Sequence, residues 1–289
     1  MIEPLRFNEG KACDAVVRHL ERREASARTN VRFPDRDRHL APVELVCTIG
    51  SQTYAIEHTG IEPFAGHMRA NAEAARLIQP IVAGVDGHLP PEDDFELQLP
   101  VRAMEALRSR NVSTVQDHII KWVVATAQGL RKPTSGRKDV TPWTSDAAGI
   151  PFALRLYRLS GFTVRPGQLQ IVHVVSNLEA ERADRIAAAL AKKAPKLAIW
   201  KRDERARTVL VLEENDIQLT NSHVVTEAVL AYEARHGHAA DEIYLVTTSF
   251  APWHVHHVQV GTRSYFDLTD PDERSWDADP SDLASLTGR

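Results

Sequence analysis

Hydrophobic and polar residues alternate along this chain with the periods of strands and helices, most clearly in residues 42–60, PVELVCTIGSQTYAIEHTG. This stretch predicts two apolar strands joined by a two-residue turn at Gly50–Ser51. Glycine in the first turn position favours a type II′ turn. Such a turn fixes the register of the hairpin and places Glu44 directly opposite Glu57, on the same face of the sheet.

The rest of the chain shows helical and extended patterns in alternation. The helical patterns cover residues 9–27, 65–81, 101–130, 177–193 and 222–237. The extended patterns cover residues 43–49, 52–59, 95–101, 152–159, 169–175, 196–202, 208–214, 242–249 and 254–260. The neighbouring strands at 196–202 and 208–214 predict a second hairpin. This order of elements predicts a mixed α/β (α+β) fold in which helices flank the sheets.

A change of composition separates the two halves of the chain. Residues 131–149, RKPTSGRKDVTPWTSDAAG, are rich in Pro, Gly, Ser and Thr and have little apolar pattern. Such a composition predicts a linker or a flexible loop. We therefore expect an α/β domain over residues 1–130 and a second α/β module over residues 150–289.

The composition is that of an ordinary globular protein. The 289 residues are 43 % hydrophobic and 26 % charged, and the net charge is −4. With this net charge, any binding of nucleic acid has to depend on local basic patches. Cys13 and Cys47 lie in a predicted helix and a predicted strand, where we expect small buried side chains rather than a disulfide or a metal pair.

The sequence also bears on location. The first residues, MIEPLRFNEGKAC, lack the basic and apolar regions of a signal peptide. No apolar run approaches the roughly 20 residues that a membrane helix needs. We therefore expect a cytoplasmic protein without a membrane partner.

The two acids of the hairpin indicate a site. Like charges directly opposite on a sheet destabilise it, so Glu44 and Glu57 require a cation, a shared proton or full solvation. Mg²⁺ is held in proteins by one or two carboxylates together with water and substrate phosphate, and such a pair suits the hydrolysis of a phosphodiester. If the turn were one residue longer, the two acids would not share a face and would be ordinary surface groups.

The arrangement resembles the PD-(D/E)XK nuclease superfamily, in which a helix with an acid precedes a hairpin with an acid on each strand, followed by a helix and a strand. The resemblance covers roughly residues 9–100 and implies a restriction-endonuclease-like mixed sheet flanked by helices. It also implies hydrolysis of nucleic acid, DNA in preference to RNA, with Mg²⁺ or Mn²⁺ as cofactor. Its metal ligands would be Glu44, Glu57 and either Glu21 or Glu24 on the first helix.

One position departs from the superfamily. The second strand ends in Glu-x-Lys in that family, and here the position of the Lys is Thr59. The Lys is expected to activate the attacking water or to stabilise charge that develops on the phosphate. Three alternatives stay open: a basic residue comes from elsewhere (His58, His67 or Arg69), the metal ion suffices with Thr59 orienting a water, or the fold is kept without catalysis.

Basic residues are concentrated just before the hairpin. For a nuclease, those expected to contact the phosphate backbone are Arg28, Arg32, Arg36, Arg38 and Arg69. Acids are interleaved among them, so a solvated, salt-bridged surface is the alternative. A second basic group, at 131–138, lies in the predicted linker, where it either clamps nucleic acid or serves solubility alone.

Other candidates are less complete. His254 and His256 share one strand face, but a zinc site needs three or four ligands. Glu62 follows the hairpin, and Glu213, Glu214 and Asp216 end a strand. These acids are possible metal ligands or simple turn residues.

Two functions therefore stand against each other. The first is a metal-dependent nuclease that uses Glu44, Glu57 and Thr59. The second is an interaction or regulatory protein that keeps the same fold without hydrolysis. No Gly-rich phosphate loop, nucleophile elbow or Cys-based zinc motif occurs in the sequence, which argues against P-loop nucleotide hydrolysis and serine esterase chemistry.

Overall fold

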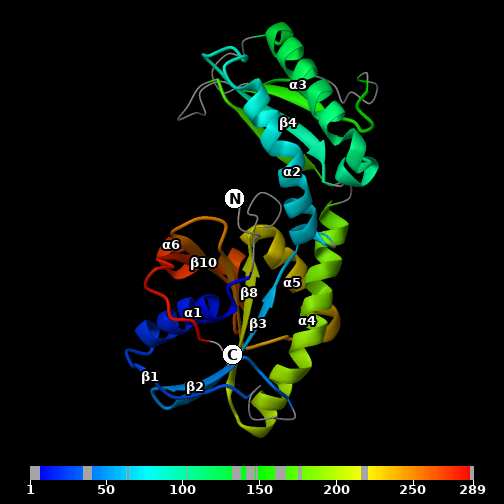
Figure 1. Ribbon diagram of the computed structural model, residues 1–289. Helices are drawn as coiled ribbons and strands as arrows, with labels where there is room; N and C mark the ends of the chain where they lie inside the picture. The colour runs from blue at the N-terminus through cyan, green and yellow to red at the C-terminus, as the bar shows by residue number, and fades with distance from the viewer. Residues whose placement is uncertain are drawn as a thin grey trace. The chain divides into compact units, whose positions relative to one another are not determined.

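The computed structural model forms two compact units (Figure 1). The core unit consists of residues 5–65 and 178–289, and the inserted unit consists of residues 66–177 together with residues 1–4. The structure describes residues 7–34, 41–62, 64, 66–101, 103–131, 138–140, 147, 149–159, 167–174, 178–215 and 221–286. The mixed α+β class that the sequence predicts is confirmed.

The predicted division of the chain at residues 131–149 is wrong. Strand β3 (Gln52–Gly60) pairs in parallel with β8 (Arg207–Glu214), so the two ends of the chain complete one sheet. The predicted linker contains β5 (Lys138–Val140), which pairs with β6 (Arg155–Leu159). Most other residues of that stretch lie outside the described part of the chain. Local composition does not predict the boundaries of the two units, because these boundaries depend on the pairing of strands that are distant in the sequence.

The core unit is built on one mixed sheet with the strand order β1-β2-β3-β8-β9-β10-β11, and β12 also pairs with β10. Strands β3, β8 and β9 run parallel to one another, and the remaining pairs are antiparallel. The further strands are β1 (Arg28–Arg32), β2 (Leu45–Ile49), β9 (Glu242–Thr247), β10 (Trp253–Val260), β11 (Arg263–Ser264) and β12 (Ser275–Ala278).

The hairpin register that the sequence predicts is confirmed. Ile49 pairs with Gln52 and Leu45 pairs with Ile56, so the turn is Gly50–Ser51. Gly50 has a φ of 61°, which a residue without a Cβ adopts at little cost. Glu44 immediately precedes β2, in line with the position opposite Glu57.

Helices cover both faces of this sheet (Figure 1). Helix α1 (Glu9–Arg23) buries Cys13, Val16 and Leu20 against one face, where Cys47 also lies. Helices α4 (Leu178–Asp203) and α5 (Ser222–His236) cover the opposite face. Both cysteines are buried, as expected. Two short elements, η3 (Tyr265–Asp267) and α6 (Pro271–Arg274), lie in the chain between β11 and β12.

Helix α4 continues well beyond the end that the sequence predicts. A strand was expected at 196–202, yet the helix runs through Pro195 to Asp203. Proline within a helix removes one backbone hydrogen bond. The apolar stripe nevertheless continues past it, because Leu197 and Trp200 are both buried in the same core as Leu190. The burial of these side chains offsets the loss at the proline.

The inserted unit has a core of its own. Its sheet has the order β5-β6-β4-β7, with β4 (Asp94–Pro100) parallel to β7 (Leu169–Val174). Helices α2 (His67–Val85) and α3 (Val112–Gly129) pack their apolar sides with this sheet, and two turns of 3₁₀-helix, η1 (Ala103–Ala106) and η2 (Ser109–Asn111), precede α3. Within the described ranges, no helix is long and apolar enough to cross a membrane.

Candidate functional site

Glu44 and Glu57 meet at a cation. Both lie on the sheet face that α4 covers, and the Nζ atom of Lys193 contacts Oε1 of Glu57 and lies 3.8 Å from Oε1 of Glu44. A second ammonium group, that of Lys196, lies 3.1 Å from the same Glu57 oxygen. The repulsion expected between the two opposed acids is therefore relieved by two ammonium groups of α4. The sequence predicted this helix in a separate module, residues 150–289.

The other oxygen of Glu57 is exceptional. The Glu57 side chain is 0 % exposed, and its Oε2 atom has no hydrogen-bond partner among the described residues. Buried polar atoms in native proteins are nearly always satisfied, and an exception points to a bound water or ion. The carboxylate thus has one oxygen held by lysines and one that is open to a further ligand.

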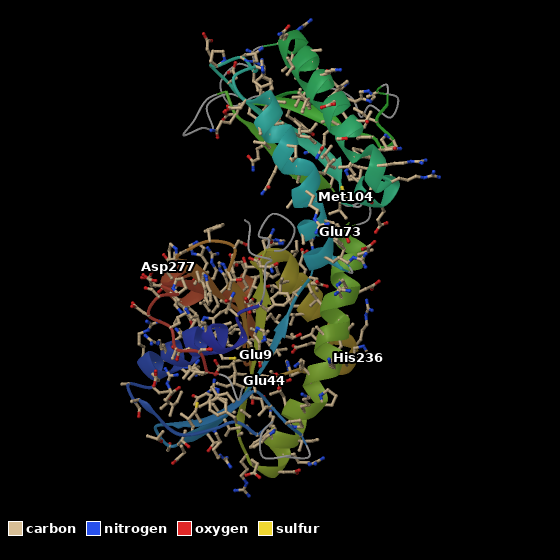
Figure 2. The ribbon with its side chains drawn as sticks, in the orientation of Figure 1. Glu9, Glu44, Glu73, Met104, His236 and Asp277 are labelled. Atoms are coloured by element: carbon tan, nitrogen blue, oxygen red, sulfur yellow. The ribbon has the colours of Figure 1, made fainter. Side chains whose placement is uncertain are left out.

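A third acid lies beside Glu44. Glu9, the first residue of α1, forms a side-chain hydrogen bond with Glu44, and Figure 2 shows the two residues next to one another. Burial, this hydrogen bond and the negative charge of Glu57 together raise the pKa of Glu44 to about 8, against the opposing effect of Lys193. Glu44 is therefore harder to ionise than an ordinary glutamate, and Lys193 is the group that favours its charged form.

Glu213 fixes the start of α1. Its carboxylate, which is fully buried, accepts hydrogen bonds from the backbone N–H of Asn8 at 2.8 Å and from Oγ1 of Thr248 at 3.0 Å. Nε2 of His58 lies 2.9 Å from the other carboxylate oxygen. Glu213 is thereby fully engaged, and it holds the residue that directly precedes Glu9.

The structure does not bring Glu21 or Glu24 to the site. Because α1 rises 1.5 Å per residue, Glu21 lies about 18 Å along the helix from Glu9. Glu21 pairs with Arg28 at 2.8 Å, and Glu24 accepts a hydrogen bond from the hydroxyl of Tyr54 at 3.1 Å. The acid of α1 that lies beside Glu44 is Glu9, at the opposite end of the same helix.

Two of the three basic residues considered in place of the lysine, His58 and Arg69, pair with other residues. His58 points to the α1 face, where it contacts Glu213. Arg69 belongs to the inserted unit, is exposed and pairs with Glu73 at 2.8 Å, and the side chain of His67 lies outside the described set. Thr59 lies two residues after Glu57 and is partly exposed. The basic groups beside Glu57 come instead from α4.

Only part of the predicted phosphate-binding surface lies in the described part of the chain. Arg28 forms ion pairs with Asp14 and Glu21, which commits its guanidinium to the protein itself. Arg32 is exposed, and its guanidinium lies 6.0 Å from the ring of Trp200. Arg36 and Arg38 fall outside the described residues.

The remaining candidates have other partners. Glu62 pairs with Arg185 at 2.9 Å, and Nδ1 of His254 lies 2.6 Å from Asp277. Asp216 is outside the described residues. Within the ranges described, no three His, Cys, Asp or Glu side chains are arranged to hold a metal ion together.

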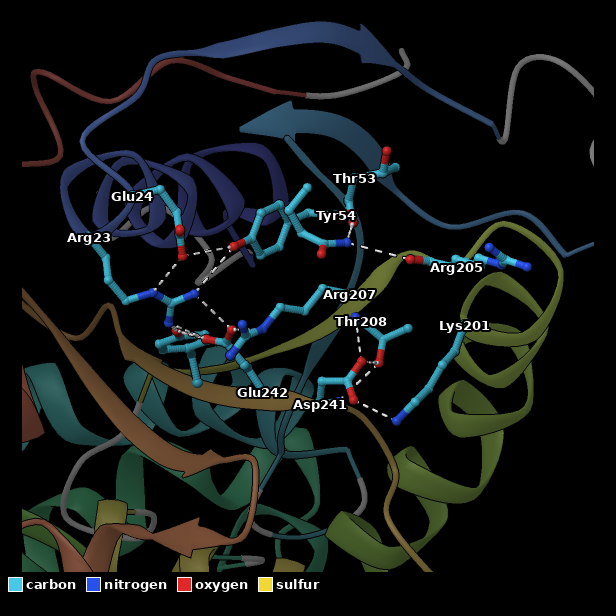
Figure 3. A network of polar contacts seen from close by, with 12 residues as sticks. Arg23, Glu24, Thr53, Tyr54, Lys201, Arg205, Arg207, Thr208, Asp241 and Glu242 are labelled. Carbon is cyan, nitrogen blue, oxygen red and sulfur yellow. Dashed lines mark hydrogen bonds and ion pairs between the residues drawn. The ribbon is translucent and has the colours of Figure 1, made fainter. Parts of the chain in front are cut away.

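A second buried acid of the core unit has a structural role. Glu242 is fully buried at the start of β9, and Arg23 binds both of its oxygens at 2.7 and 2.9 Å. Arg207 lies 2.6 Å from it (Figure 3). A carboxylate that is satisfied on every side by two arginines is a fixed link between α1, β8 and β9.

Sequence reasoning missed Glu9, Lys193 and Lys196. The two lysines belong to the sequence KKAPK, residues 192–196, beside an apolar stripe that continues to Trp200, and that stripe was the signal available. Comparisons with protein-family models, with curated proteins and with solved structures give no match for this chain.

Proposed function

We propose that this protein hydrolyses phosphodiester bonds of nucleic acid with a Mg²⁺ or Mn²⁺ ion, at a site of the PD-(D/E)XK kind. The convergence of Glu44 and Glu57 on one cation, the ammonium group of Lys193, supports this most directly. The order of a helix, an antiparallel hairpin, a further helix and a parallel strand supports it as well. Two opposed carboxylates that already hold one cation have the charge to hold a divalent one.

The donor atoms fit a hard ion. Glu44 and Glu57 supply carboxylate oxygens, and Oε2 of Glu57 is buried without a hydrogen-bond partner among the described residues. These two residues would hold the ion, while Glu9 would keep Glu44 in place, and water and substrate phosphate would complete the ligand set. Such an ion lowers the pKa of a bound water and offsets charge on the phosphate.

The lysines of α4 would take the part of the lysine that Thr59 replaces. Lys193 and Lys196 bring two ammonium groups to Glu57. In the presence of substrate, the same groups would bind the non-bridging phosphate oxygens and stabilise the charge that develops there. Thr59 shares the strand face of Glu57 and is available to orient a water.

The test is cleavage by purified protein of single- and double-stranded DNA and RNA in Mn²⁺ or Mg²⁺. We expect metal-dependent cleavage that is lost in Glu57→Gln, because the substitution removes the charge that holds the cations. Glu204→Gln, at an exposed position next to the end of α4, is the matched control and should cleave like the wild type. Cleavage that survives Glu57→Gln in a folded protein would contradict the proposal.

A second candidate is an interaction or regulatory protein that keeps the fold without hydrolysis. The ion pairs of Glu57 with Lys193 and Lys196 favour it, because they neutralise the carboxylate without a metal. A folded wild type that neither binds Mn²⁺ nor cleaves any of the four nucleic acids would support this candidate.

A further inference from the structure

Lys193 occupies the place between the two acids. Its Nζ contacts Oε1 of Glu57, lies 3.8 Å from Oε1 of Glu44, and belongs to a side chain that is only 12 % exposed. Lys196 reaches Glu57 alone and is 31 % exposed. Lys193 is therefore the group that links the two carboxylates, and Lys196 adds charge from the side.

A divalent ion and this ammonium group exclude one another. A divalent ion bound to both carboxylates lies about 2 Å from an oxygen atom of each. Nζ of Lys193 now occupies the space between these oxygen atoms. Repulsion between the ion and an ammonium group at such a distance is strong, because the site is largely shielded from water. Metal binding therefore requires Lys193 to leave its position.

Lys193 needs a new anion when it leaves. Two lysines face the two carboxylates, so adding a divalent ion alone gives the cluster an excess of positive charge. A phosphodiester supplies one negative charge for each residue of nucleic acid, and an ammonium group is a good partner for it. The most direct way to load the site is to bring the ion and the phosphate together.

We propose that Lys193 is an internal cation that keeps divalent ions out of the free protein, so that the metal ion and a phosphodiester bind cooperatively. This inference rests on the proposed function and adds how its site is regulated. Lys193 changes partner from Glu57 to phosphate, and the carboxylates pass from the lysine to the metal. In the free protein, Lys193 lies between the two carboxylates and closes the site to a divalent ion.

The experiment is a titration of Mn²⁺ followed by the EPR signal of the free ion, without nucleic acid. Lys193→Met removes the internal cation, and we expect it to tighten Mn²⁺ binding at least about tenfold, the effect of a neighbouring charge in a partly buried site. Lys192→Met changes an exposed lysine of the same helix and should leave the affinity unchanged. Circular dichroism checks folding, and Lys193→Gln replaces the Met variant if that one does not fold.

The second arm adds a short oligonucleotide, with blank titrations of the oligonucleotide alone. A phosphorothioate strand, which keeps its charge and resists cleavage, should tighten Mn²⁺ binding to the wild type about tenfold and to Lys193→Met far less. A methylphosphonate strand, which is uncharged, should have no effect on either protein.

The outcomes separate the two proposals. One outcome is that, without nucleic acid, the wild type binds Mn²⁺ as tightly as Lys193→Met does and Glu57→Gln does not bind it. This outcome would overturn the role of Lys193 as an internal cation and leave the proposed function standing. Absence of Mn²⁺ binding in every variant, with or without the phosphorothioate strand, would overturn both.

Discussion

The buried carboxylate of Glu213 accepts the backbone N–H of Asn8 at 2.8 Å on each of its oxygens, across a separation of 205 residues. Carboxylates are favoured at helix N-termini, because the first N–H groups are unpaired and the helix dipole is positive there. Here the carboxylate comes from strand β8 and not from the helix itself. The position of Glu9 thus depends on a residue near the other end of the chain.

We expect Glu213→Gln to destabilise the core unit by about 2–3 kcal/mol, the usual range for hydrogen bonds to a buried charged group. The amide keeps the shape but replaces an acceptor by a donor that faces the N–H of Asn8. Urea unfolding followed by circular dichroism measures the loss, with exposed Glu204→Gln as the control. An unchanged unfolding midpoint would show that the link is not important for stability.

The ring cluster of the core unit should make stability depend on pH. His19 stacks on Trp276 with 3.8 Å between ring centroids and lies 4.9 Å from the ring of His257. Burial, the charge of His257 and that of Arg23 lower the pKa of His19 to about 3. Burial also lowers the pKa of His257, against the opposing effect of the hydrogen bond that its Nδ1 donates to the backbone carbonyl of Glu273.

A lowered histidine pKa means that the unfolded chain binds the proton first. Stability should therefore be full above about pH 6.5, the pKa of an unfolded histidine, and should fall as the pH drops from there toward 3. His19→Phe keeps the stacking but cannot be protonated, so its stability should fall less between pH 7 and pH 5. Urea unfolding at both values checks this, and equal losses in the two proteins would refute it.

Trp200 gives a direct test of the second half of α4. It is 1 % exposed, and its Nε1 donates a hydrogen bond to the carbonyl of Ala41 at 2.7 Å. Trp200→Ala should cost about 3–5 kcal/mol through the cavity it leaves. Trp200→Phe keeps most of the volume and loses the hydrogen bond, so it should cost about 1–2 kcal/mol. Thermal and urea unfolding compare the pair, and small losses in both would contradict a packed helix beyond Pro195.

The sequence predicts correctly those parts of the fold that depend on neighbouring residues in the chain. A Gly-led two-residue turn between alternating strands determines the hairpin register, and this register alone brings Glu44 and Glu57 together. The residues of the Glu57–Lys193 pair are 136 positions apart in the sequence, and no local pattern predicts a contact over such a separation. The apolar run after Pro195 also fits a strand as well as a helix, because short apolar runs are ambiguous.

Glu9 was missed for a different reason. An acid in the first turn of a helix is common, since it complements the helix dipole. Its contact with Glu44 follows only from the way in which α1 lies on the sheet. The division into units was missed because β3 finds its parallel partner after the inserted unit, and composition at residues 131–149 carries no trace of that pairing.

The insertion sets an order of events during synthesis. The ribosome completes β3 before it makes any of β8, and the inserted unit, which has its own core, emerges in between. Until β8 is made, the edge of β3 that faces β8 is unpaired. Unpaired strand edges in incomplete chains are prone to association with the wrong partner. A chain cut short between the end of β3 and the start of α4 carries Glu9, Glu44 and Glu57 but neither lysine. The completed cluster of acids and lysines therefore exists only in a chain whose synthesis has passed the inserted unit and α4.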